Sequence, residues 1–163
     1  MVTKKIAFKL ANVSDANKII KMYKMGFKTL FETYQDTKTN PYMESKDDIY
    51  RKINQNNSYY FFILQDQHEI GLIRVMLDSE DTTHAKISPI LILPEFENKG
   101  FAQMALLQIE EKFSSVKQWY IDTIKQETKL LHLYTKSGYI LMNQPELYIK
   151  EGMDLVFLTK STV

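Results

Sequence analysis

A single glycine lies between a short apolar strand and an amphipathic helix, and its surroundings could bind an anion. The strand is predicted over residues 90–93, Pro94 ends it, and Gly100 opens a helix predicted over about 100–113. The first N–H groups of a helix have no acceptor within the helix and converge on one place with the preceding turn. Gly100 lets a ligand approach closely because it has no side chain and tolerates positive φ. A phosphate or pyrophosphate would suit this arrangement.

The common nucleotide motifs do not describe this loop. A Walker loop needs Gly-Lys-Ser/Thr, whereas Phe101 follows Gly100 here. A dinucleotide fingerprint needs three spaced glycines, and Gly100 stands alone in the loop. A nucleotide-binding domain is therefore disfavoured.

The composition limits the classes of protein that this chain can belong to. It has 163 residues, 44% hydrophobic and 25% charged, with a net charge of +1. These values suit one folded domain over residues 1–163, and the charge balance predicts no nucleic-acid partner. The sequence has no apolar run of membrane-spanning length and no apolar signal segment at its start, so we expect a cytoplasmic protein that does not bind a membrane.

Metal chemistry is not expected. There is no cysteine, and the three histidines are scattered without metal-ligand spacing (His68, His84 and His132). The sequence therefore predicts no metal, no disulfide and no cysteine nucleophile.

The elements that must position the Gly100 loop follow from periodicity and turn residues. Strands are predicted at 6–10, 59–64, 70–77, 84–93, 119–124, 139–142 and 155–158. Helices are predicted from the cap at 12–15 to about 32, and over 45–53, 100–113 and 127–137, the last ended by Gly138. Pro89 lies inside a strand, which indicates an edge, a bulge or a place where two strands part.

Two segments resemble motifs of the GNAT N-acetyltransferase family. Residues 97–102, Glu-Asn-Lys-Gly-Phe-Ala, resemble its acyl-CoA pyrophosphate loop Q/R-x-x-G-x-G/A, with Glu97 in place of Gln or Arg. Residues 131–139, Leu-His-Leu-Tyr-Thr-Lys-Ser-Gly-Tyr, resemble its A-x-x-L-Y-x-x-x-G-F helix segment. The motifs occur in the family's order with one strand between them, and the terminal Gly-Met-Asp-Leu-Val-Phe-Leu-Thr-Lys resembles its last strand.

The resemblance implies a mixed α+β fold. In the GNAT fold a central, mostly antiparallel sheet of six to seven strands splays between strands 4 and 5, and about four helices flank it. The same resemblance implies an acetyl-CoA-dependent transfer of an acetyl group directly to a primary amine.

The resemblance also assigns the catalytic groups. Tyr134 would protonate the departing thiolate. Asp122 occupies a position where some relatives carry a catalytic Glu; it is either the general base or a strand-end carboxylate that favours a cationic substrate. Glu32, which borders the acceptor region, is the alternative base. His132 faces away from Tyr134, because two residues span roughly 200° of a helix.

The cofactor contacts are implied to be mostly main-chain. The backbone of Leu91, Ile92 and Leu93 would pair with the pantetheine arm where the strands splay. Glu127 would lie on the face of its helix that looks toward the cofactor, as would Leu131 and Tyr134. The pyrophosphate would meet N–H groups of the loop and first helical turn: Asn98, Lys99, Gly100, Phe101, Ala102 and Gln103.

The acceptor is not identified by these residues. The acidic and aromatic segment 31–36, including Glu32 and Tyr34, could line a pocket for a cationic amine, although a solvated polar segment has the same composition. A polyamine, an aminoglycoside, an amino acid, a peptide N-terminus and a protein lysine all remain open, as does a homodimer through the terminal strands.

Two departures keep a second function open. Glu97 and Glu127 each add a negative charge near an anionic cofactor. Lys99, Lys125 and Lys129 could offset that charge. The alternative to an enzyme is therefore a non-catalytic acyl-CoA-binding sensor or assembly module of the same fold.

Overall fold

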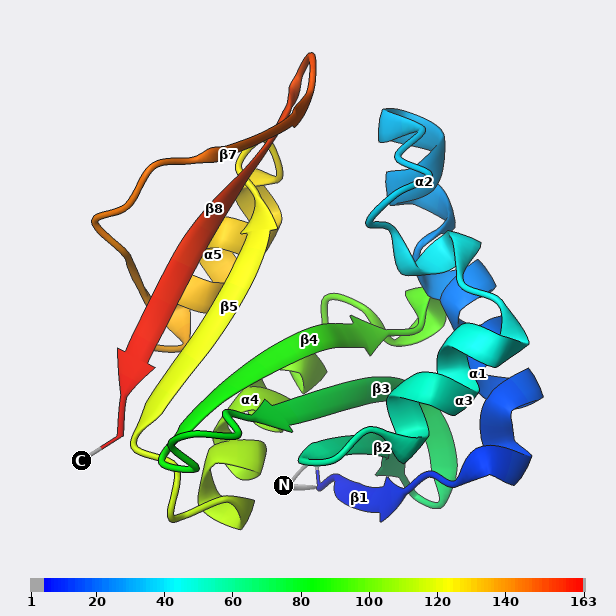
Figure 1. Ribbon diagram of the computed structural model, residues 1–163. Coiled ribbons are helices and arrows are strands. Elements are labelled where there is room, and N and C mark those ends of the chain that lie inside the picture. The colour runs from blue at the N-terminus through cyan, green and yellow to red at the C-terminus, as the bar shows by residue number, and fades with distance from the viewer. Residues whose placement is uncertain (1–4, 163) are drawn as a thin grey trace.

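The computed structural model describes residues 5–162, in which eight strands form one sheet flanked by five α-helices (Figure 1). The strands are β1 (Ala7–Leu10), β2 (Ser58–Gln65), β3 (His68–Leu77), β4 (His84–Ile92), β5 (Gln118–Ile124), β6 (Ile140–Leu141), β7 (Leu147–Lys150) and β8 (Met153–Ser161). The helices are α1 (Ala16–Gly26), α2 (Lys28–Tyr34), α3 (Lys46–Asn54), α4 (Phe101–Lys112) and α5 (Thr128–Lys136). No helix among residues 5–162 is long and apolar enough to cross a membrane.

The sheet confirms the mostly antiparallel architecture. Its strand order is β1-β2-β3-β4-β5-β8-β6, and β7 also pairs with β8. Every neighbouring pair is antiparallel except β4 and β5, which run parallel. The β2–β3 hairpin forms as predicted, with Asp66 and Gln67 at positive φ in its turn.

Local capping explains where α3 begins and where α5 ends. Ser45 caps α3 through a reciprocal capping box with Asp48. Gly138, at φ +99°, ends α5, and the following Tyr139 N–H donates to the Tyr134 carbonyl. Both ends were predicted from the sequence, because these signals lie within a few residues of each other.

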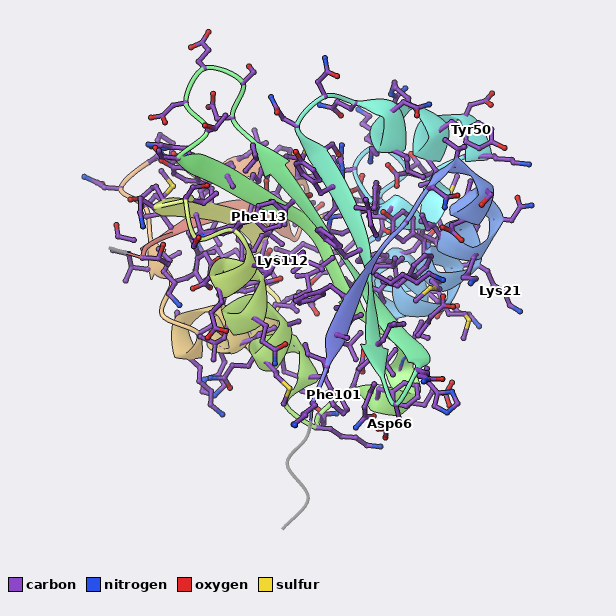
Figure 2. The ribbon with its side chains drawn as sticks, turned by 90° about the horizontal axis from the view of Figure 1, so that it is seen from below. Lys21, Tyr50, Asp66, Phe101, Lys112 and Phe113 are labelled. Atoms are coloured by element: carbon purple, nitrogen blue, oxygen red, sulfur yellow. The ribbon has the colours of Figure 1, made fainter. Side chains whose placement is uncertain are left out.

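Two hydrophobic layers hold the helices against opposite faces of the sheet. One layer packs α1 and α3 on β2, β3 and the end of β4, with Ile19, Tyr23, Phe62 and Leu72 almost completely buried. The other packs α4 and α5 on the opposite face around Trp119, which is also completely buried. Figure 2 shows α4 from below the sheet, with Phe101 at one end and Lys112 and Phe113 at the other.

The parallel pair β4–β5 separates soon after it forms. Only His84–Lys86 pair with Gln118–Tyr120, and beyond these residues the two strands diverge (Figure 1). We call this point the fork. On the other side of β4 a bulge shifts the register, since Ile87 pairs with Val75 but Ile90 pairs with Ile73. Pro89 lies in this bulge. Of the three alternatives that it indicated, an edge is wrong because β4 pairs with both β3 and β5, whereas a bulge and parting strands both occur.

Three details of the predicted order were wrong. The first helix is two helices, α1 and α2, separated at Phe27. Gly26 lets the end of α1 approach β4 so closely that a Cβ there would overlap Leu91 Cδ1. The final strands also differ, because β6 is only two residues long and β7, which was not predicted, forms a hairpin with β8.

Candidate active site

The Gly100 loop joins β4 to α4 at the open end of the fork. A short 3-10 turn over Pro94–Phe96 ends the strand segment, and Asn98 and Gly100 follow at φ +61° and +85°. Gly100 is the N-cap residue of α4, as the sequence predicted. A Cβ built on Gly100 would meet no heavy atom of the described chain within 4 Å. The space in front of Gly100 is therefore open, and the N-terminal turn of α4 borders it.

A pocket of about 480 Å³ lies between this loop and the start of α5. Its lining combines an amide, a hydroxyl, an ammonium and an imidazole, from Asn98, Thr128, Lys129 and His132. These side chains can donate hydrogen bonds to an anion, and Lys129 adds positive charge. Thr128 and His132 were not predicted as site residues. Their spacing of four residues on a helix, which puts them on one face, could have indicated them.

The remaining residues of the loop are divided between surface and core. Phe101 is buried in the layer beneath α4, and Ala102 and Gln103 are half-buried in its first turn. The Lys99 ammonium lies 5.8 Å from the centre of the Phe96 ring. Glu97 is exposed. The structure therefore brings the predicted loop residues together at one end of α4.

Beyond the bulge, the backbone N–H and C=O groups of every second β4 residue face the fork. The Leu93 N–H donates to the Ile70 carbonyl at 2.8 Å, and the Leu93 carbonyl accepts from Phe96 N–H at 2.9 Å. Because backbone groups alternate along an antiparallel strand, Leu91 also faces β3, whereas Ile90 and Ile92 face the fork. Of the three residues predicted to bind a pantetheine arm, Ile92 is the one whose backbone groups are directed there. Ile90 joins it and was not predicted.

Tyr134 lies in the core layer on the α5 side of the fork. Its side chain is buried, and its ring packs edge-on against the Tyr139 ring at 6.3 Å between centroids. Burial raises the pKa of the Tyr134 phenol well above its usual value, and the negative charge of Asp122 raises it further. Tyr134 therefore keeps its proton throughout the neutral pH range.

Asp122 lies on β5 just beyond the fork and has a cationic partner. Its Oδ2 is 2.6 Å from Lys86 Nζ, and both side chains are partly exposed. Lys86 is the last β4 residue that pairs with β5, opposite Tyr120. It was not predicted as a site residue, because nothing in the local sequence indicates that the two strands bring it to Asp122.

A smaller pocket of about 220 Å³ lies beside this ion pair. Its polar lining includes Lys86, His84, Tyr120 and Asp78. His84 Nδ1 is 2.9 Å from the Tyr120 hydroxyl, and the two rings stack. The pocket opens on the sheet face opposite the one that buries Trp119.

The two residues predicted for the acceptor side have different surroundings. The Tyr34 hydroxyl donates to Glu127 Oε2 at 2.6 Å, so α2 contacts the N-cap residue of α5. Partial burial, together with Glu127, raises the pKa of Tyr34 to about 12. Glu32 is exposed, and its ion-pair partner is Lys28 on the same helix, at 3.9 Å. The structure thus joins Tyr34 to the cofactor side and leaves Glu32 at the surface.

The described residues 5–162 contain no group of three side chains suited to holding a metal ion.

Comparison with protein families matches residues 27–139 to the sequence profile described as "Acetyltransferase (GNAT) family". The match covers more than half of the chain and includes α2, the fork, the Gly100 loop and α5. No curated protein matches the chain at a significant level.

Several solved structures share this fold at low sequence identity. An acetyltransferase from Thermus thermophilus superposes with a TM-score of 0.78 at 13% identity, covering 99% of this chain and 100% of that one. The PaiA N-acetyltransferase from Thermoplasma acidophilum, in complex with coenzyme A, gives 0.75 at 16% identity, covering 97% and 99%. Spermidine N-acetyltransferase from Vibrio cholerae, in complex with CoA and spermine, gives 0.76 at 18% identity, covering 96% and 95%.

Proposed function

Since this chain belongs to the acetyltransferase (GNAT) family, we propose that it transfers an acetyl group from acetyl-CoA directly to a primary amine. The observation that carries the proposal is the fork, which has the Gly100 loop at its open end, Tyr134 on one side and Asp122 just beyond the last strand pair. We further propose that residues 1–163 act as one N-acetyltransferase domain.

The residues around the larger pocket fit the anionic end of acetyl-CoA. Asn98, Lys129 and His132 would contact the pyrophosphate together with N–H groups of the loop and of the first turn of α4. The fork-facing backbone of Ile90 and Ile92 would pair with the pantetheine arm as an added strand. Acetyl-CoA supplies the acetyl group as an activated thioester. The structures of PaiA and of spermidine N-acetyltransferase, both in complex with CoA, support this assignment.

The proton transfers fall to Asp122 and Tyr134. Asp122 already contacts an ammonium group, that of Lys86, so it can accept a proton from an amine bound in the same place. Tyr134 is buried and protonated, so it can donate a proton to the leaving sulfur. Glu32 is less suited to act as the base because it is exposed and pairs with Lys28.

The acceptor that these surroundings favour is a cationic primary amine. Asp122 and Asp78 provide carboxylates on the acceptor side, and Tyr34 at the end of α2 provides aromatic surface. Three neighbouring structures are of a spermidine N-acetyltransferase or its chimeras, one of them in complex with CoA and spermine. A polyamine is accordingly the first acceptor to test.

One observation favours the second candidate, a non-catalytic acyl-CoA sensor. Asp122, the proposed base, forms an ion pair with Lys86, with 2.6 Å between Oδ2 and Nζ. An acceptor amine must displace that ammonium. If displacement never occurs, the protein binds acetyl-CoA without turnover.

The experiment is a thiol-release assay with acetyl-CoA and a panel of amines: spermidine, an amino acid, an aminoglycoside and a short peptide. Amine-dependent release of CoA above the hydrolysis rate supports the enzyme. Binding of acetyl-CoA without amine-dependent release from any of these would support the sensor instead.

A further inference from the structure

The Lys86 side chain places a primary amine at the fork. Lys86 is the last β4 residue in the parallel ladder, and its Nζ lies 2.6 Å from Asp122 Oδ2. It also lines the 220 Å³ pocket, so its amine is reachable from solvent. The side chain is 42% exposed, and that of Asp122 is 24% exposed.

This position is the one that the acceptor amine requires. An amine that loses its proton to Asp122 must come within hydrogen-bond distance of that carboxylate, and Lys86 Nζ is already there. Tyr134 lies in the layer on the other face of the sheet, yet it is near enough to Asp122 for the charge of that carboxylate to raise its pKa. Lys86 therefore resembles a bound acceptor.

We propose that Lys86 is an internal acetyl acceptor, which this protein acetylates on Nζ with its own acetyl-CoA. This inference rests on the proposed function. The Lys86 ammonium gives a proton to Asp122, and its nitrogen forms an amide bond to the acetyl carbon. The carbon–sulfur bond breaks, and the thiolate takes a proton from Tyr134. The second proton of the amine nitrogen restores the Tyr134 phenol, so the products are acetylated Lys86, CoA and the proton that Asp122 releases to solvent.

Acetylation would change the acceptor side of the fork. The amide nitrogen of acetyllysine carries no positive charge, so the ion pair with Asp122 is lost. The Asp122 carboxylate is then available to an incoming cationic amine. The unmodified ion pair, by contrast, makes Lys86 a competitor for that amine.

Lys18 is a matched control within the same chain. Its Nζ pairs with Glu69 Oε1 at 2.8 Å, with side-chain exposures of 45% and 26%, close to those of Lys86 and Asp122. It lies on α1, with its partner on β3. Chemical acetylation without catalysis would modify Lys18 slowly, because its hydrogen bond to Glu69 raises the pKa of its ammonium, so a rate difference counts as catalysis only when it is large.

The test is a time course of the purified full-length protein with acetyl-CoA, with acetyl occupancy of each lysine measured by peptide mass spectrometry. We expect Lys86 to be acetylated at least about 10²-fold faster than Lys18, the usual size of general acid–base catalysis. Tyr134→Phe should reduce the Lys86 rate toward that of Lys18. Equal rates at both lysines in the parent protein would overturn the inference.

A second readout does not depend on turnover. Without acetyl-CoA, reductive methylation should label both lysines, and added CoA should protect Lys86 but leave Lys18 labelled. Calorimetry and thiol release on the same preparation separate the two failures. If acetyl-CoA binds and free amines are acetylated while Lys86 matches Lys18, this inference alone fails. If acetyl-CoA does not bind, the proposed function fails, and the inference fails with it.

Discussion

The Tyr34 hydroxyl donates a hydrogen bond of 2.6 Å to Glu127 Oε2, although the two residues are 93 positions apart in the chain. Tyr34 ends α2, and Glu127 is the N-cap residue of α5. The bond thus connects helices that lie on opposite sides of the fork in Figure 1. It joins the proposed acceptor side to the proposed cofactor side.

Removing this bond should loosen α2. Tyr34→Phe deletes a hydrogen bond to a charged group, so we expect a loss of about 1.5 kcal/mol in the free energy of unfolding. Amide hydrogen exchange in α2 should also become faster. Tyr148→Phe, at a residue that is 69% exposed, is the control and should change neither quantity. Unchanged exchange in the Tyr34 variant would show that other contacts hold α2.

Tyr134→Phe should abolish most turnover and preserve cofactor binding. The phenol is the proposed proton donor, so its loss should lower kcat by about 10²-fold or more while the Kd for CoA stays within about twofold. Tyr139→Phe is the matched control, because Tyr139 is a neighbouring buried tyrosine whose hydroxyl has no hydrogen-bond partner in residues 5–162. Equal kcat values for these two variants would remove Tyr134 from the mechanism.

Gly100→Ala should weaken cofactor binding beyond its cost in stability. Gly100 has φ +85°, so alanine is strained there by about 1 kcal/mol, although its Cβ meets no neighbour. Gly152, at φ +79° in the β7–β8 turn, has the same open surroundings. Both Ala variants should therefore unfold at similarly reduced temperatures, while only Gly100→Ala raises the Kd for CoA. A similar Kd in both variants would contradict the role of the loop.

The general base can be identified by comparing two amide substitutions. Asp122→Asn should lower kcat by about 10²-fold, whereas Glu32→Gln should leave kcat nearly unchanged. The physical reason is that Asp122 already binds an amine, whereas Glu32 is exposed beside Lys28. Thiol-release kinetics at saturating acetyl-CoA measure both. The reverse pattern would assign the base to Glu32.

Alkaline pH should destabilise the fold, because the buried Tyr134 and Tyr139 resist ionisation. Burial raises the pKa of both Tyr134 and Tyr139, while an unfolded tyrosine ionises near ~10. Their contribution to the free energy of unfolding is therefore fully present below pH ~10. Above that pH the unfolded state loses the proton first, so the free energy of unfolding falls by about 1.4 kcal/mol per pH unit for each tyrosine. Denaturant unfolding between pH ~9 and ~11, on either side of that value, measures the slope. Tyr134→Phe should reduce it, and an unchanged slope would contradict the burial effect.

The features that the sequence could predict are those encoded over a few residues. The Gly100 loop, the Ser45 cap and the end of α5 at Gly138 each depend on neighbouring side chains and backbone angles. Pro89 indicated an edge, a bulge or parting strands, and the family resemblance placed the parting between the fourth and fifth strands. The overall fold was implied by the resemblance of two motifs and of the element order to the GNAT family.

The features that the sequence could not predict depend on distant parts of the chain. Lys86 meets Asp122 only because two strands are parallel in one register, and Tyr34 meets Glu127 only because α2 folds back to α5. The break between α1 and α2 lies at Phe27, next to the point where Gly26 packs closely against Leu91 of β4. β7 is short and its first residues are exposed, so its sequence lacks the buried alternation of a typical strand.

The most direct measurement is a calorimetric titration of the protein with acetyl-CoA, with ATP and NADH as controls. The fork, the Gly100 loop and the pocket beside α5 predict saturable binding of acetyl-CoA and no comparable binding of either control. Failure of acetyl-CoA to bind, or equal binding of all three, would contradict the account.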